Sequence, residues 1–222
     1  MLRLDAVSHR YPGSDVDALE ELSLQVPGGT AMGLFAPSGS GKTTLMRIAS
    51  LSLRPTGGAV TVAGHPVSGV RYAVPRSIRR TMGTVGQSPR AATSPRLSLR
   101  RIIAEPLSFA DGRRTPHASA YTERIAELAD LVQLSPDLLD RLPHQVSDGQ
   151  LQRACLARAL ALDPKVLLCD EPTAMLDAST TAVIMRVIAG RAERGAAVLV
   201  ASHDHAVLGA SCHVLRPLGG TE

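Results

Sequence analysis

Residues 31–49 have the sequence AMGLFAPSGSGKTTLMRIA, which indicates the fold more clearly than any other part of the chain. Its first five residues form a continuous apolar run, which is typical of a strand buried in a parallel sheet. A loop rich in glycine and serine follows, and residues 44–49 have a helical pattern. A strand, a glycine-rich loop and a helix in this order are the context that a phosphate-binding loop requires. We therefore predict that this stretch binds phosphate.

The glycine-rich loop matches the P-loop pattern, with Ala36 in place of the first glycine. In such a loop, backbone N–H groups at a helix N-terminus surround a phosphate group. Gly39 and Gly41 would let the backbone approach the phosphate oxygens. Lys42 would reach the β- and γ-phosphates as a catalytic residue, and the hydroxyl of Thr43 would ligate Mg²⁺. The predicted phosphate-binding residues are Ser38, Gly39, Ser40, Gly41, Lys42, Thr43 and Thr44.

Lysine is rare in this chain, because Lys42 and Lys165 are the only two among 24 basic residues. The presence of Lys42 in the most glycine-rich stretch is therefore hard to explain by composition alone. A chance loop of serine and glycine is the alternative. The strand and the helix on either side of the loop favour phosphate binding.

A second strand ends in two carboxylates. Residues 166–169 are apolar, and Asp170 and Glu171 follow them directly. Ligands of open α/β folds bind at the carboxyl ends of such strands. We expect Asp170 to hold Mg²⁺, directly or through water, and Glu171 to act as the general base on an attacking water. A solvated strand end is the alternative, and the P-loop elsewhere in the chain favours the catalytic interpretation.

Strand and helix patterns alternate along the chain. Residues 2–6 and 22–26 alternate between apolar and polar, and we expect them to form strands at a sheet edge. Residues 88–162 have a mainly helical period, and another helix is expected near residues 179–194. This alternation predicts a mainly parallel sheet covered by helices, with a helical subdomain. Further strands are predicted at residues 59–63, 82–86, 166–169 and 197–201.

Composition excludes several classes of protein. The chain has 222 residues, of which 44% are hydrophobic and 20% charged, which is typical of a globular domain. No apolar run approaches the roughly 20 residues that span a bilayer. The first residues lack the apolar segment of a secretory signal, so we expect a cytoplasmic location. The three cysteines are far apart in the sequence, which argues against a disulfide framework and a structural zinc site.

The charge does not identify a partner. A net charge of +4 permits binding to nucleic acid, but aromatic residues make up only 2% of the chain, which disfavours base stacking. Arginine-rich stretches occur at residues 71–80, 96–101 and 113–114. We interpret them as solvated faces or contacts to a partner subunit, with a nucleic-acid groove as the alternative.

Further short motifs in this sequence resemble the motifs of one known protein family. The sequence VSDGQ at residues 146–150 resembles the LSGGQ signature of ABC transporter ATP-binding subunits. Gln87 matches the glutamine of the family's Q-loop, AMLD at residues 174–177 matches its D-loop, and His203 matches its switch histidine. Tyr11 is placed like the aromatic residue that stacks on adenine. Any of these residues alone could be structural, and Tyr11 could simply be a packing residue. Their order and spacing together identify the family.

The resemblance implies an α/β fold of the P-loop NTPase (RecA-like) type. It consists of a mainly parallel sheet, an N-terminal antiparallel β part and an inserted helical subdomain. In one ATP-binding cassette domain, residues 1–87 and 163–222 would form the core and residues 88–162 the helical signature subdomain. The implied catalytic residues are Glu171, His203, Lys42 and Gln87. The implied metal ligands are Thr43, Gln87 and Asp170. Besides the loop, the implied nucleotide contacts are Tyr11, Ser147, Gly149, Gln150 and Asp177.

A finer resemblance points to ATPases of dipeptide, oligopeptide and nickel importers. It rests on IIAEPL at residues 102–107, LPHQ at 142–145 and ALALDP at 159–164. The resemblance implies an ATP-hydrolysing subunit on the cytoplasmic face of the membrane. ATP and Mg²⁺ would lie between the P-loop of one subunit and the signature of a second, identical or related subunit. Transmembrane permease subunits would be the other partners, without direct contact to the transported substrate.

The signature departs from the family pattern at Asp148, where the family has glycine. A carboxylate there would repel a phosphate held by the partner at a cost on the order of 1 kcal/mol. Alternatively, Asp148 is a helix N-terminal acid that stabilises its own helix. Three other functions stay open: a soluble ABC-type ATPase that acts on nucleic acid or the ribosome, a P-loop kinase, and a regulatory half-site with weak turnover.

Overall fold

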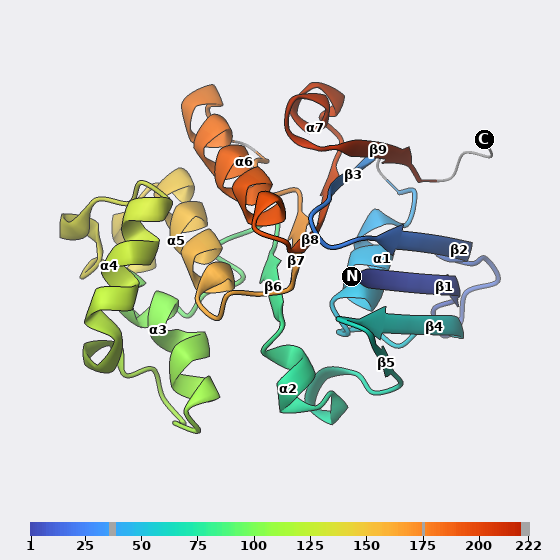
Figure 1. Ribbon diagram of the computed structural model, residues 1–222, viewed down its shortest axis with the longest axis horizontal. Helices are drawn as coiled ribbons and strands as arrows, with labels where there is room; N and C mark the ends of the chain where they lie inside the picture. Colours follow the sequence, from blue (N-terminus) through green and yellow to red (C-terminus); the bar gives the residue numbers. More distant parts are fainter. Residues whose placement is uncertain (36–38, 175, 219–222) are drawn as a thin grey trace.

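The computed structural model describes residues 1–35, 39–174 and 176–218. Five parallel strands form its central sheet, in the order β6-β7-β8-β3-β9 (Figure 1). Because all the pairings are parallel, each strand is connected to the next through a crossover. The strands are β3 (Ala31–Phe35), β6 (Met82–Val85), β7 (Val166–Asp170), β8 (Ala197–Ser202) and β9 (Val214–Pro217).

The apolar runs of these strands are explained by two separate hydrophobic clusters. Leu167 and Val198 belong to the cluster that includes helices of the middle segment, whereas Leu168 and Leu199 belong to the cluster below the N-terminal strands. Successive residues of a strand point to opposite faces. Both faces of β7 and β8 are therefore buried, and both strands need apolar residues at every position.

The N-terminal strands form a sheet of their own. The order is β2-β1-β4-β5, and all three pairings are antiparallel. The resemblance implied an N-terminal antiparallel β part, and this sheet confirms it, with β2 at one edge. Burial alternates along β1, because one face of this sheet packs on helix α1 and the other meets solvent. The strands are β1 (Leu2–His9), β2 (Leu19–Val26), β4 (Gly57–Val62) and β5 (His65–Val67).

Helices fill the middle of the chain and lie together at one end of the molecule (Figure 1). They are α3 (Leu99–Ala110), α4 (Thr122–Leu131) and α5 (Asp148–Leu160), with short 3₁₀ turns between them. Helix α5 contacts α3, α4 and β6, so it connects this helical part to the edge of the parallel sheet. From residue 99 onward, the segment 88–162 is mainly helical, as its periodicity predicts.

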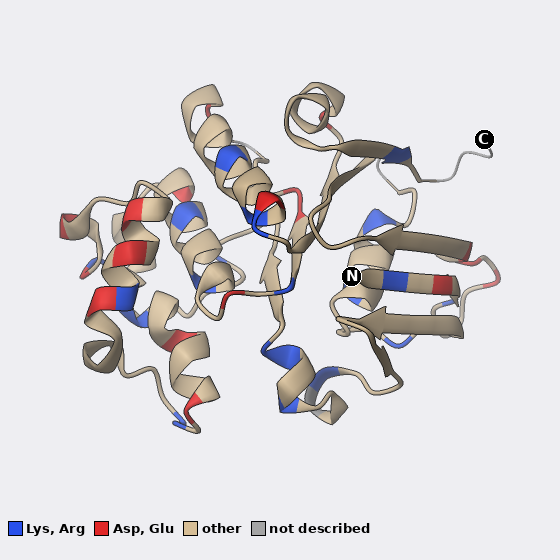
Figure 2. Ribbon diagram, in the orientation of Figure 1, with Lys and Arg blue, Asp and Glu red and all other residues tan. Residues whose placement is uncertain are grey.

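The remaining helices belong to the core. They are α1 (Lys42–Ala49), α2 (Arg76–Arg79), α6 (Ala178–Glu193) and α7 (His205–Ser211). Helix α2 carries basic residues, and its two arginines, Arg76 and Arg79, are exposed (Figure 2). The short elements α2, α7, β5 and β9 were not predicted from the sequence. Within the described ranges, no helix combines the length and the apolar character that crossing a bilayer requires.

Candidate active site

The register of the parallel sheet brings three motifs to one edge. Phe35, the last residue of β3, pairs with Ser202, and Ala201 pairs with Asp170 at the end of β7. The chain therefore leaves β3, β8 and β7 at the same level of the sheet. The glycine-rich loop follows β3, His203 follows β8, and Glu171 follows β7. Residues that are far apart in the sequence thus meet at the carboxyl edge, as the carboxylate motif predicted.

Helix α1 begins directly after the glycine-rich loop. Gly41 is its N-cap with a φ of 86°, and a Cβ atom at this position would lie 2.4 Å from the carbonyl oxygen of Ala18. Only glycine fits this backbone conformation and this close approach. The N-terminus of α1 therefore lies where the P-loop interpretation requires it, with Lys42 and Thr43 as its first residues. Ala36, Pro37 and the predicted contact Ser38 lie outside the described residues.

The buried lysine of the loop faces the buried glutamate of β7. Lys42 is 9% exposed and Glu171 is 8% exposed. The Nζ atom of Lys42 lies 3.7 Å from Oε1 of Glu171. Two buried ionisable groups of opposite charge compensate each other's loss of hydration. Lys42 is therefore held at the carboxyl edge, where a phosphate bound by the loop would replace Glu171 as its counter-charge.

Glu171 makes its other contacts through Oε2. Ser202 Oγ donates a hydrogen bond to this atom over 3.2 Å, and His203 Nδ1 lies 2.9 Å from it. The backbone of Glu171 has a φ of 48°, in the left-handed region, and its N–H donates to the carbonyl of Ala201 over 2.8 Å. A non-glycine residue in this region is strained and persists only where the surrounding contacts hold it. Both carboxylate oxygens of Glu171 are therefore oriented.

Asp170 and Thr43 supply the donors that a magnesium ion prefers. Burial and the neighbouring Glu171 raise the pKa of Asp170, while Lys42 lowers it. Two adjacent carboxylates in a partly buried site disfavour each other's ionisation, and a divalent cation relieves this repulsion. Hydroxyl and carboxylate oxygens are hard ligands that suit Mg²⁺. Thr43 is exposed in the first turn of α1, so the donor set at this edge fits the ion.

Tyr11 lies beside the first turn of α1. Its hydroxyl is 3.3 Å from Thr44 Oγ1, and this hydrogen bond lowers the pKa of the phenol. The ring packs edge-on against His9 with the ring centroids 4.7 Å apart. Tyr11 is 37% exposed. The ring therefore stands next to the phosphate-binding loop with solvent access, where a nucleotide base could stack on it.

The signature segment begins helix α5. The hydroxyl of Ser147 accepts a hydrogen bond from the backbone N–H of Gln150, and the side chain of Gln150 accepts one from the backbone of Ser147. This reciprocal capping box fixes the helix N-terminus. Gly149 packs closely on α6, because a Cβ atom there would lie 3.1 Å from Thr180. The signature and the start of α6 thus form one continuous surface.

The D-loop aspartate caps helix α6. Ser179 Oγ donates to Asp177 over 2.5 Å, and the backbone N–H of Thr180 donates over 2.9 Å. These hydrogen bonds hold the pKa of Asp177 well below its usual range. The carboxylate of Asp177, which the resemblance assigns to the nucleotide, is therefore engaged within its own chain. Met175 of the same motif lies outside the described residues.

Gln87 lies on the loop that leaves β6, the edge strand of the parallel sheet. It is exposed in the loop after β6, next to the end of β7. Its predecessor Gly86 is anchored by a residue that sequence reasoning missed. Gln152 is 2% exposed on α5, and its Nε2 donates to the carbonyls of Gly86 and Pro172 over 3.1 and 2.9 Å. Gln152 therefore links α5 to the ends of both β6 and β7, and only its burial reveals this role.

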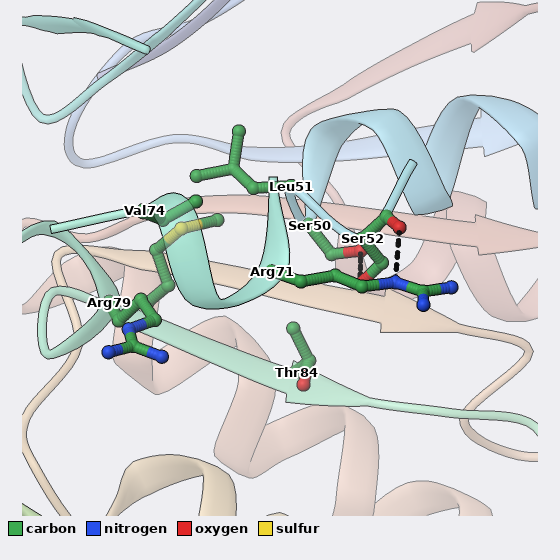
Figure 3. Close-up of a pocket in the computed structure, with 8 residues that line it drawn as sticks. Ser50, Leu51, Ser52, Arg71, Val74, Arg79 and Thr84 are labelled. Atoms are coloured by element: carbon green, nitrogen blue, oxygen red, sulfur yellow. Dashed lines mark hydrogen bonds between the residues drawn. The ribbon is translucent and has the colours of Figure 1, made fainter. Parts of the chain in front are cut away.

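The exposed edge of β6 is flanked by two hollows. One has a volume of about 510 Å³ and lies between α1, α2 and β6 (Figure 3). In it, Arg71 donates to the carbonyl of Ser52 over 3.2 Å. The second has a volume of about 230 Å³ and lies between β6, α3 and α5. Met82 and Thr84 of β6 line both hollows.

Comparison with known proteins agrees with this geometry. A profile of the ABC transporter family matches residues 19–174. The chain is 38% identical over 207 residues to the nickel import ATP-binding protein NikE of Brucella suis, covering 89% of this chain and 74% of that protein. It is 36% identical over 215 residues to the methionine import ATP-binding protein MetN of Cupriavidus metallidurans, covering 96% of this chain and 60% of that protein.

A solved structure shares the whole fold. The dimeric structure of MJ0796, a bacterial ABC transporter cassette, superposes with a TM-score of 0.88 at 29% identity, covering 98% of this chain and 94% of that chain. The same protein is also known as a dimer in a post-hydrolysis state, bound to ADP and phosphate, with a TM-score of 0.87.

Proposed function

This chain belongs to the ABC transporter family, and we propose that it is the ATP-hydrolysing subunit of an importer of peptides, nickel or similar small solutes. The observation that carries the proposal is the position of Glu171. Its carboxylate lies between Lys42 and His203 at the carboxyl edge of the sheet. The family match supports this function over an ATPase that acts on nucleic acid, and the relatives named for nickel and methionine import support import.

The residues around Glu171 fit ATP hydrolysis. The loop and the N-terminus of α1 would bind the β- and γ-phosphates, with Lys42 turning from Glu171 to the phosphate. Glu171 would accept a proton from the attacking water, and His203 would orient the carboxylate through Oε2. Thr43 and Asp170 would hold Mg²⁺, which neutralises phosphate charge when bound. Tyr11 would stack on the adenine.

The signature would act on a nucleotide that a second subunit holds. Two copies, or this chain and a related one, would pair head to tail, with the N-terminus of α5 directed at the γ-phosphate of the partner's ATP. The dimeric structures of MJ0796 support this arrangement. ATP binding would close the pair, and hydrolysis would open it.

We place the contact with the transmembrane subunits at the hollows beside β6. This edge lies between the core and the helical part, next to Gln87, so it would move when the two parts move. Phe109 is 47% exposed and lines the smaller hollow. Phe109→Asp should abolish co-purification with the membrane subunits and leave hydrolysis by the isolated chain intact. Val16→Asp, which changes another exposed apolar residue, is the control.

The proposed activity is tested by phosphate release from Mg-ATP over a series of protein concentrations. Specific activity should rise with concentration if a pair is required. It should fall by about a hundredfold or more in Glu171→Gln, because general base catalysis contributes roughly 10²–10⁴-fold. ATP binding should persist in this variant. Glu193→Gln, which changes an exposed glutamate of α6, is the matched control. Unchanged turnover in Glu171→Gln would refute the general base, and no Mg-ATP binding by the wild-type chain would refute the proposed function.

A further inference from the structure

Arg90, three residues after Gln87, contacts the signature segment with its whole guanidinium group. Its Nε lies 2.7 Å from Oδ1 of Asp148. Its Nη1 donates to the carbonyl of Pro143 over 2.9 Å, and its Nη2 donates to the carbonyl of Val146 over 3.2 Å. One side chain therefore holds both the turn before helix α5 and the first residue of that helix.

Asp148 is the residue at which the signature departs from the family pattern. It is the first residue of α5, between the cap residue Ser147 and the closely packed Gly149. Negative charge at this helix end favours the helix itself but opposes an anion that approaches the same end. A carboxylate that is not neutralised would weaken binding of the partner's nucleotide by about fivefold, which corresponds to about 1 kcal/mol. The ion pair with Arg90 supplies that neutralisation.

Arg90 is part of a longer attachment between two motifs. Gln152, one turn after Asp148, donates to the carbonyl of Gly86 over 3.1 Å. Arg158, further along α5, donates to the carbonyl of Ala92 over 2.7 Å. Three side-chain contacts thus attach the segment from Gly86 to Ala92 to helix α5. The contact made by Arg90 is the one nearest to the signature. A change in the position of this segment would be transmitted to Asp148.

We propose that Arg90 is a positioning residue that makes a signature with Asp148 competent to bind the partner's nucleotide. Arg90 neutralises the carboxylate and fixes the turn from which α5 starts, so the N-terminus of α5 keeps its attraction for the γ-phosphate. The two residues form a matched pair, in which the arginine is needed because the aspartate is present. This inference rests on the proposed function, since it concerns the ATP-dependent pair of subunits.

A contribution to the stability of the fold does not explain the ion pair between Arg90 and Asp148. The side chains of Arg90 and Asp148 are 47% and 60% exposed, and ion pairs at such exposure contribute little to folding. The effect is therefore expected in ATP-dependent association rather than in thermal unfolding. A separate measurement of Mg-ADP affinity reports on the P-loop of the single subunit, which Arg90 does not touch.

The experiment measures the effect of Arg90→Ala in three backgrounds: with Asp148, with Asp148→Gly and with Asp148→Asn. Each chain also carries Glu171→Gln to prevent hydrolysis, and sedimentation velocity with Mg-ATP gives the dissociation constant of the pair. With Asp148 present, Arg90→Ala should weaken association at least about fivefold, which corresponds to about 1 kcal/mol. In both other backgrounds the loss should be clearly smaller, because only the hydrogen bonds to the carbonyls of Pro143 and Val146 are removed and no carboxylate remains to be neutralised.

Two controls keep the result interpretable. Arg100→Ala removes an arginine from another surface pair, in which Nε lies 2.9 Å from Asp140 Oδ1, and should not change association. Mg-ADP affinity and the melting temperature should be unchanged in Arg90→Ala. An equal loss in all three backgrounds, or no loss in any, overturns the inference. Failure of the Glu171→Gln chain to bind Mg-ATP at all would overturn the proposed function, and this inference with it.

Discussion

Nδ1 of His203 lies 2.9 Å from Oε2 of Glu171, although 32 residues separate the two in sequence. The histidine side chain is 66% exposed, whereas that of the glutamate is 10% exposed. A mostly exposed ring is thus in contact with a buried carboxylate through one nitrogen. The ring would meet solvent or a partner on its other side and orient the carboxylate on this side.

The first prediction concerns this contact. His203→Ala removes one of the two groups that orient Oε2 of Glu171 and should lower the rate of ATP hydrolysis by about tenfold or more. Affinity for Mg-ADP should stay within about twofold of the wild-type value, because the P-loop is unchanged. Steady-state phosphate release and equilibrium nucleotide titration measure the two quantities. His65→Ala, at an exposed position of β5, is the control. Equal activity in the two variants would contradict the orienting role.

The second prediction compares the two lysines of the chain, Lys42 and Lys165, in Mg-ATP binding. Lys42→Ala removes the cation that faces both Glu171 and the expected phosphate, and should abolish measurable Mg-ATP binding at micromolar nucleotide. Lys165→Ala changes the only other lysine, which is exposed before β7, and should bind as the wild type does. Isothermal titration with Mg-ATP compares the two. Similar affinities in both variants would mean that Lys42 has only a structural role.

The third prediction concerns the buried Gln152. Gln152→Leu keeps the volume but leaves the carbonyls of Gly86 and Pro172 without this donor. Pro172 is buried, and an unpaired buried carbonyl costs roughly 1–3 kcal/mol, but the substitution also removes the buried Oε1 of Gln152, which has no hydrogen-bond partner among the described residues. The free energy of unfolding should therefore fall by about 1 kcal/mol. Urea denaturation followed by circular dichroism measures it. Gln25→Leu, on the exposed side of β2, should change it by less than about 0.5 kcal/mol. A Gln152→Leu variant as stable as wild type would show that these bonds contribute nothing.

The fourth prediction concerns the reactivity of the cysteine thiols and its dependence on pH. Burial raises the pKa of Cys212 to about 11. A thiol is neutral below its pKa, so only about 0.1% of Cys212 is thiolate at pH 8, and the thiolate is the reactive form. Alkylation by iodoacetamide should therefore be slow and accelerate about tenfold per pH unit from 7 to 9.5. Mass spectrometry of digested protein gives the rates.

Two internal references accompany the thiol measurement. Cys155 and Cys169 are buried, and burial raises the pKa of each, so neither should react in the folded chain. In urea all three thiols should react at similar rates. A rate for Cys212 that levels off near pH 9 in the folded protein would contradict its raised pKa.

Much of the fold followed from local patterns. The central strands β3, β6, β7 and β8 were predicted because buried parallel strands need apolar residues on both faces. The short elements β5, β9, α2 and α7 were missed, since three to seven residues carry too little periodicity to separate a helix or strand from a loop. The alternation in β1 and β2 predicts half-buried strands but does not say with which strands they pair, and the structure shows them in a separate antiparallel sheet.

Local sequence patterns indicate which chemistry is available: a glycine-rich loop with Lys42, two acids after an apolar strand, and a helix that follows the signature. These features depend on residues that are close together in the chain, so the local sequence supplies the side chains and favours the backbone conformation that presents them. Which of these groups meet depends on the packing of the whole chain. The strand order β6-β7-β8-β3-β9 brings Glu171 between Lys42 and His203, and the packing of α5 brings Arg90 to Asp148. Such contacts depend on strand order and on helix packing, and these are set by the burial of the whole chain rather than by any local pattern.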